Sequence, residues 1–196
     1  MNNYLNCCFL FLALSSCKGK TDDNDIGVVL HNDNHIPDKQ ANDYFDKGIK
    51  YVEHGDYDQA KNFFLKADQR CPNLPVVLNS IGNCYVVMHL PESGIPYYEK
   101  ALKADSSFVK SYINLGNCLN NLKDFEKATQ ILYLGLARNS PYPIDRHMLF
   151  LNLASAYYYQ HNKDKAVEML DSITADPNHD QVFEQAVEFE KHINTP

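Results

Sequence analysis

The sequence has 196 residues, 44% of them hydrophobic, and its 25 acidic and 18 basic side chains give a net charge of −7. A chain of this length and apolar content can bury a core, which excludes wholesale disorder. The acidic balance and the scattered Lys and Arg exclude unspecific binding to nucleic acid or to anionic lipid surfaces.

The first residues predict an export leader. Residues 7–14 form an apolar run of signal-peptide length that is too short to span a bilayer. The Leu-Ser-Ser-Cys sequence that follows ends at Cys17 and resembles the lipobox of bacterial lipoproteins. The resemblance implies a signal peptide over residues 1–16, a fatty acid such as palmitate on Cys17, and a lipid anchor in the cell envelope, on the periplasmic or surface face of the outer membrane. Because no Lys or Arg precedes the run, a cytosolic protein with an apolar N-terminus is the alternative.

Residues 17–40 predict a flexible tether, because small, polar and acidic residues there cannot pack into a core. Acids soon after the lipidated cysteine also resemble the surface-export signals of some Gram-negative lipoproteins, and a plain solvated linker is the alternative. His31, Asp33 and His35 carry metal-binding groups. Three such ligands in a mobile segment usually bind nothing, so we expect no metal site.

A 34-residue repeat organises the rest of the chain. Units begin at Ala41, Pro75 and Val109, and a fourth begins at His147 after a four-residue insertion. Positions 8 and 20 of each unit hold small residues, and positions 11 and 24 hold large apolar ones. A fixed period of this length indicates stacked helical units that bury their apolar faces on one another. Position 8 holds Gly48, Gly82, Gly116 and Ala154, and position 27 holds Ala67, Ala101, Gly135 and the oversized Ile173.

This pattern resembles the tetratricopeptide repeat family. The resemblance implies an all-α fold, a right-handed superhelix of about four helical hairpins plus a C-terminal capping helix, in a domain over residues 41–196. The fourth unit departs most from the family pattern. The predicted repeats cover 41–74, 75–108, 109–142 and 147–180.

The apolar periodicity predicts two helices in each unit. Pro96 lies inside one of them and should disturb it. A further amphipathic stretch predicts a capping helix at about 180–194, and the alternative is the first helix of a truncated fifth repeat. The predicted paired helices are 41–54, 57–70, 75–88, 91–104, 109–122, 125–138, 146–160 and 163–174.

No catalytic motif is present, so we expect no enzyme activity, no cofactor and no catalytic residues. The cysteines of the repeat region lack the C-x-x-C spacing of a zinc site. Cys84 and Cys118 share position 10, where the separation of neighbouring helices makes a disulfide doubtful. We therefore expect buried free thiols.

In the family, positions 2, 5, 9, 12 and 13 of each first helix face a concave groove. Asn83 and Asn117 occupy equivalent places, and a carboxamide both donates and accepts hydrogen bonds, so a ladder of them could hold an extended peptide. A polar, solvated surface is the alternative. Phe45 and Ile49 stand where carboxylate-capturing members have Lys and Asn, which argues against that subtype. The predicted groove residues are Asn79, Asn83, Lys110, Asn117, Asn120, Asn121, Ser155, Tyr158 and Tyr159.

The sequence thus predicts a lipid-anchored scaffold that binds a protein or peptide partner in its groove. A second copy of the chain is an alternative partner, since the first and last units are apolar at groove positions. A structural subunit of an envelope assembly without a groove ligand, and an accessory factor to an envelope enzyme, are the competing hypotheses.

Overall fold

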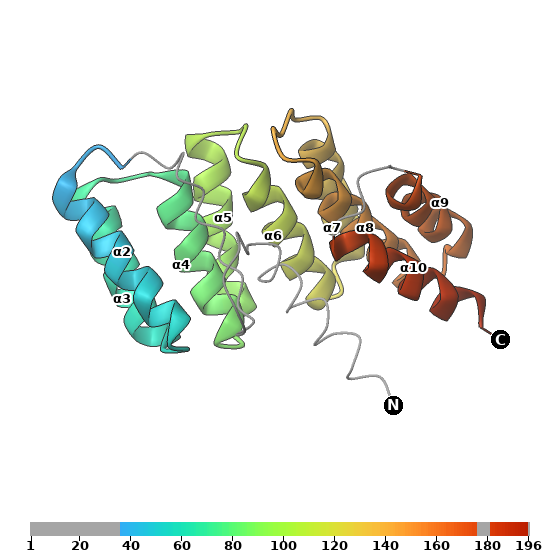
Figure 1. Cartoon of the computed structure of the whole chain (residues 1–196), viewed down its shortest axis with the longest axis horizontal. Helices are drawn as coiled ribbons and strands as arrows, with labels where there is room; N and C mark the ends of the chain where they lie inside the picture. The colour runs from blue at the N-terminus through green and yellow to red at the C-terminus, as the bar shows by residue number, and fades with distance from the viewer. Residues whose placement is uncertain (1–35, 176–180, 196) are drawn as a thin grey trace.

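The structure is a computed structural model that describes residues 36–175 and 181–195. Within these ranges all regular structure is α-helical, and antiparallel helix pairs follow one another along the long axis of the molecule (Figure 1). The predicted fold class is therefore confirmed. The predicted leader, the lipidation site Cys17 and the trio His31, Asp33 and His35 lie outside the described residues.

Eight helices form four hairpins, and their bounds agree with the predicted ones to within three residues. Helix α8 begins at Pro143, earlier than predicted, because the four-residue insertion forms an extra first turn. Proline fits the first helical position, whose N–H has no partner inside the helix. The hairpins are α2 (Lys39–Glu53) with α3 (Tyr57–Arg70), α4 (Pro75–Val87) with α5 (Pro91–Ala104), α6 (Val109–Asn121) with α7 (Phe125–Leu136), and α8 (Pro143–Tyr159) with α9 (Lys163–Thr174), followed by α10 (Gln181–Asn194).

Pro96 does not interrupt α5, so the predicted disturbance is wrong. A proline removes one hydrogen bond, to the carbonyl four residues earlier, which here belongs to Glu92. Both Pro96 and Glu92 are exposed. We infer that water satisfies this carbonyl, so the helix continues.

The small residue at position 8 lets the two helices of each hairpin approach closely. A methyl group on Gly48 would come 2.5 Å from Cε1 of Phe64, and one on Gly82 would come 2.6 Å from Cε1 of Tyr98. Both distances are far below van der Waals contact, and in each case the partner stands at position 24 of the same unit. Gly116 faces Leu132 in the same way. The repeat therefore encodes a steric match within each hairpin.

The turn between the paired helices is the same in all four units. Its position-15 residue has a left-handed backbone, with φ of 75° at Gly55, 61° at His89, 63° at Lys123 and 60° at His161. The residue after it donates its backbone N–H to the position-11 carbonyl, as Asp56 does to Tyr51 at 2.9 Å. Only the first unit has the glycine that this conformation favours.

Helix α10 takes the place of a fifth unit's first helix, packing on α8 and α9 (Figure 1). Val182, Ala186 and Phe189 are buried on that side. The opposite side exposes Glu188 and Lys191, which stand at positions 8 and 11 of the 34-residue phase. Charged residues therefore replace the small and aromatic ones that a second helix packs against in the other units, as expected of a capping helix.

Candidate functional site

The predicted site residues lie on α4, α6 and α8, the first helices of three successive hairpins. We call the surface formed by positions 2, 5, 9, 12 and 13 of these helices the A-helix face. Helix α6 contacts both α4 and α8, so the face is continuous across three units. Asn79 and Asn83 come from α4, Lys110, Asn117, Asn120 and Asn121 from α6, and Ser155, Tyr158 and Tyr159 from α8.

A hydrogen-bonded network joins α4 to α6 through carboxamides. The Asn114 amide nitrogen donates to Oδ1 of both Asn79 and Asn83, at 3.0 Å each. Oδ1 of Asn79 also accepts from the Ser111 hydroxyl at 3.1 Å, and Oδ1 of Asn83 accepts from the Tyr98 hydroxyl at 2.8 Å. A carbonyl oxygen has two lone pairs, so both acceptors are fully used. Only the amide N–H groups of Asn79 and Asn83 are left for a ligand.

Asn120 links α6 to α8 through a hydrogen bond. Its side chain is 9% exposed and donates to the backbone carbonyl of Asn152 at 2.9 Å. The neighbouring Asn121 differs, because its amide nitrogen is buried and has no hydrogen-bond partner in the structure as described. A buried donor without an acceptor is destabilising, so Asn121 is the carboxamide whose burial a ligand carbonyl would compensate.

The tyrosines at the end of α8 belong to an aromatic cluster. Tyr159 stacks on Phe125 with ring centroids 5.6 Å apart and an angle of 10°. Tyr158 meets the edge of Phe189 from α10 at 5.5 Å, so the capping helix contributes to this part of the face. Loss of hydration raises the pKa of Tyr159 above its ordinary value. Lys110 lies 5.8 Å from the centre of the Tyr142 ring.

Burial divides the predicted site into two groups. Four of the nine residues are less than a tenth exposed, which leaves little of their side chains for a partner: Asn79, Asn117, Asn120 and Ser155. The other five are half-buried and can reach a partner: Asn83, Lys110, Asn121, Tyr158 and Tyr159. The half-buried part of the face therefore combines amide and ammonium groups on α4 and α6 with tyrosine rings on α8.

Asn114 and Ser111, which hold the network together, are not among the predicted site residues. A signal for Asn114 was present, since position 6 is polar in three successive units as Ser80, Asn114 and Asn152. Asn152 resembles Asn114 in using its amide nitrogen, which donates to the Met148 carbonyl at 2.8 Å. A polar residue repeated among apolar neighbours indicates a buried hydrogen bond.

No group of three or more His, Cys, Asp or Glu among the residues that the structure describes could hold a metal ion. The predicted free thiols are confirmed, since Cys84 and Cys118 are buried and form no disulfide. Burial raises the pKa of each thiol to about 12. No helix in the described ranges is long and apolar enough to cross a membrane.

A stack of helical hairpins that pack on their neighbours is the architecture of helical repeat proteins. In this chain a small residue at position 8 lets the two helices of each hairpin meet. Three segments match family models described as tetratricopeptide repeat, over residues 43–74, 97–130 and 149–179. The last match covers the fourth unit, which departs most from the family pattern. The chain therefore carries tetratricopeptide repeats, and its fold is that of a tetratricopeptide repeat protein, a class whose members are generally interaction scaffolds without enzyme activity.

Solved structures show the same architecture. YrrB, described as a tetratricopeptide repeat protein with an unusual peptide-binding site, is 25% identical, with a TM-score of 0.63 over 77% of this chain and 74% of that one. TTC0263 of Thermus thermophilus is 17% identical, with a TM-score of 0.66 over 79% of this chain and 83% of that one. The first such domain of Spaghetti (RPAP3), bound to an HSP90 peptide, is 20% identical, with a TM-score of 0.58 over 65% and 98%. No protein of curated function matches the sequence significantly.

Proposed function

We propose that this chain is a membrane-anchored interaction scaffold that binds an extended segment of a partner polypeptide on its A-helix face. The observation that carries the proposal is the half-buried set on α4, α6 and α8, which combines amide donors with tyrosine rings. Tetratricopeptide folds are protein-binding scaffolds, and two of the similar structures bind or are described as binding peptides.

The chemistry of the face indicates which part of a peptide it would hold. The amides of Asn83 and Asn121 offer N–H donors to backbone carbonyls, because the Asn83 oxygen already accepts two hydrogen bonds. Tyr158 and Tyr159 offer ring surface to an apolar side chain further along the peptide. A segment that presents carbonyls at one end and an apolar residue at the other fits this arrangement.

A comparative capture experiment tests the groove. The chain with Asn83→Ala and Asn121→Ala, on α4 and α6, should lose a partner that the unaltered chain retains from detergent-solubilised membranes. The matched control is Gln130→Ala, which removes an exposed amide from α7 on the other helix layer. Thermal unfolding must show that all three proteins are folded. Equal capture by the variant and the control would favour a structural subunit that uses other faces.

The anchor is a separate part of the proposal and rests on the lipobox resemblance at Cys17. Cells expressing the full chain with Cys17 or with Cys17→Ser are labelled with radioactive palmitate. We expect labelling and membrane retention only with the cysteine, because acylation requires the thiol. Equal labelling of both proteins would contradict the anchor and leave the groove proposal untouched.

A further inference from the structure

The N-terminal end of the helical stack differs from every internal junction. Positions 3, 7, 10 and 14 of α4 hold Val77, Ile81, Cys84 and Met88, which pack in one core with α3 of the preceding hairpin. At the same positions α2, which no described helix precedes, carries exposed and polar residues. These are Asp43, Lys47, Lys50 and His54.

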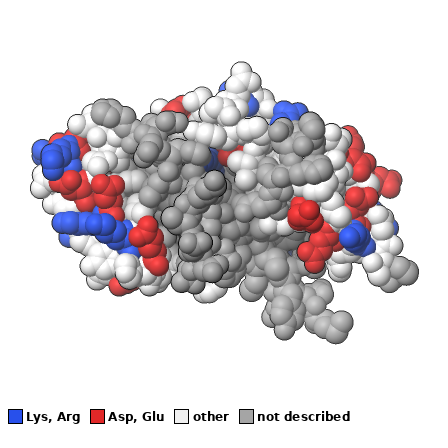
Figure 2. Space-filling model, in the orientation of Figure 1, with Lys and Arg blue, Asp and Glu red and all other residues white. Residues whose placement is uncertain are grey.

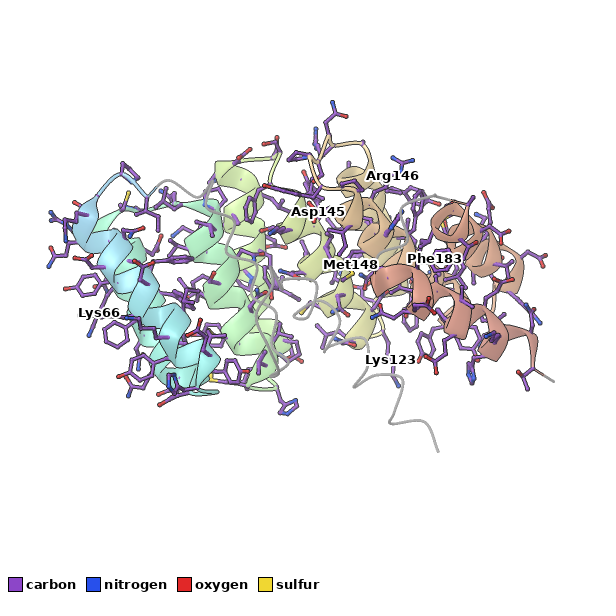
Figure 3. All side chains as sticks on the ribbon, viewed as in Figure 1. Lys66, Lys123, Asp145, Arg146, Met148 and Phe183 are labelled. Carbon is purple, nitrogen blue, oxygen red and sulfur yellow. The ribbon has the colours of Figure 1, made fainter. Side chains whose placement is uncertain are left out.

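This end contains a hollow beside an uncovered pair of rings. Tyr51 stacks on Phe63 with centroids 5.3 Å apart and an angle of 13°, and Tyr51 is 36% exposed. The hollow has a volume of about 710 Å³. Lys66 projects from α3 beside it (Figure 3). The lining residues are Lys47, Lys50, Tyr51, His54, Asp56 and Phe63.

The second unit shows what occupies the equivalent place inside the stack. There Tyr85 stacks on Tyr97, the residues 34 positions after Tyr51 and Phe63, at 5.6 Å. The preceding helix α3 covers this pair, with the Lys61 ammonium 5.3 Å from the Tyr85 ring centre and Tyr57 packed in the same core. The repeat itself therefore indicates that a helix fits against the uncovered rings of the first unit.

The charges at the N-terminal end select the kind of helix. The ammonium groups of Lys47 and Lys66 lie 5.9 Å and 4.7 Å from the Phe63 ring centre. Like Lys50, neither forms an ion pair with any carboxylate in the part of the chain that the structure describes. Basic side chains gather visibly at this end, next to acidic ones (Figure 2).

Three acids at this end of the stack already have partners. Asp43 pairs with Lys39 at 3.1 Å, and Asp58 pairs with Lys61 at 2.7 Å. Asp56 caps α3 by accepting from the backbone N–H of Gln59 at 3.1 Å. Between the first two hairpins the cation, Lys61, belongs to α3, the helix that covers the rings. At the N-terminal end the cations Lys47 and Lys66 belong to the surface that carries the rings. Lysines without a carboxylate partner favour acids on the covering helix.

We propose that the N-terminal end, formed by Lys47, Lys50, Tyr51, His54, Phe63 and Lys66, docks an acidic amphipathic helix of a partner protein. An aromatic or large apolar side chain of that helix enters the hollow against Tyr51 and Phe63. Its carboxylates pair with Lys47, Lys50 and Lys66. This site lies on α2 and α3 and is distinct from the A-helix face, so the two can be occupied together.

The probe is a synthetic helical peptide of about 14 residues, roughly four turns, with two Phe and several Glu on one face. Its binding to the full chain is measured by fluorescence anisotropy. Charge reversal by Lys47→Glu and Lys50→Glu should raise the Kd by about tenfold or more, because attraction between the peptide and the chain becomes repulsion. Peptide variants with Gln in place of Glu, or Ala in place of Phe, should also bind the unaltered chain with a higher Kd.

The matched control reverses two exposed lysines elsewhere, Lys103→Glu and Lys163→Glu, which changes the net charge equally. This variant should bind the peptide as the unaltered chain does. Equal weakening in both variants, or none in either, overturns the site. Sedimentation that shows concentration-dependent self-association, lost only in the Lys47 and Lys50 variant, also overturns the proposal, because the occupant is then a second copy. Loss of groove capture by the Asn83 and Asn121 variant affects none of these readouts.

Discussion

Position 10 shows how one place in the repeat acquires different chemistry in different units. In the second and third units it holds Cys84 and Cys118, which pack between helices and whose pKa is raised to about 12 by burial. An unfolded thiol has a pKa of about 8.5, so the folded thiols hold their protons more tightly. Their contribution to stability is complete below about pH 8.5 and is lost as the pH rises from there toward 12. In the first unit the same position is the exposed Lys50.

This burial predicts a large difference in thiol reactivity. With iodoacetamide at about pH 8, Cys84 and Cys118 should remain unmodified in the folded chain, because the thiolate is the reactive form and both groups are protonated. Cys71 is half-buried and should react first. Peptide mass spectrometry over time gives the rates, and urea-unfolded protein, in which all three react, is the control. Early modification of Cys118 in the folded chain would contradict the burial.

At the scale of the element, position 16 is the N-cap residue that directly precedes the second helix of each hairpin. Three units have a capping side chain there, since Asp56, Asp124 and Asn162 each accept a hydrogen bond from the backbone N–H three residues later. The second unit has Leu90 instead, which is 50% exposed and makes no capping bond. The turns before these helices also depart from the favoured residue. Each has one residue with a left-handed backbone, and in three of the four turns that residue is not glycine.

Leu90→Asp should add the missing cap to α5. We expect the free energy of unfolding to rise by about 1 kcal/mol, because a backbone N–H of the first turn gains an acceptor. Urea unfolding followed by circular dichroism measures the change. Asp124→Ala, which removes the equivalent cap from α7, should lower the free energy by a similar amount. A loss of stability in Leu90→Asp would mean that Leu90 packs against something essential.

Lys123→Gly should stabilise the turn between α6 and α7. The left-handed backbone costs a residue with a side chain roughly 1 kcal/mol relative to glycine. We expect a gain of about that size in the free energy of unfolding, offset in part by the greater freedom of glycine in the unfolded chain. Gly55→Ala is the reciprocal test, and thermal unfolding should show it to be destabilised.

At the scale of the whole molecule, the core is a row of clusters along the stack. One joins α2, α3 and α4, one centres on Tyr98 and Leu115, and one runs from α6 to α10. Each hairpin thus depends mainly on its neighbours, as expected of a solenoid. Local stability should therefore respond to a mutation near the site of change and less at the far end.

Phe189→Ala tests this organisation through the capping helix. The ring is 5% exposed, and its loss should cost roughly 3 kcal/mol in the last unit. Hydrogen exchange followed by mass spectrometry should show faster exchange in α8, α9 and α10 and little change in α2 and α3. Phe45→Ala, at the other end, should give the opposite pattern. Uniformly faster exchange in either variant would show that the molecule unfolds as one unit.

The helices could be predicted closely because their determinants are local and repeated. Three were predicted with their observed bounds, over 57–70, 91–104 and 163–174. The carboxamide site could not be predicted in the same way. Asn114 contacts Asn79 and Asn83 across 35 and 31 residues, and which of its faces meets α4 depends on how α6 is rotated in the stack. The family pattern specifies small residues at the helix contacts and leaves polar partners open.

The sequence alone determined the pairing of helices, because tiny side chains in a 34-residue phase leave only one close approach within each hairpin, as at Gly48 and Phe64. It also indicated a further helix at about 180–194, because apolar residues recur there at helical spacing. Only the tertiary structure decided which asparagines join helices and which can meet a partner, and that Tyr51 and Phe63 are left uncovered. Hydrogen bonding and burial depend on the juxtaposition of distant segments, which no local pattern records.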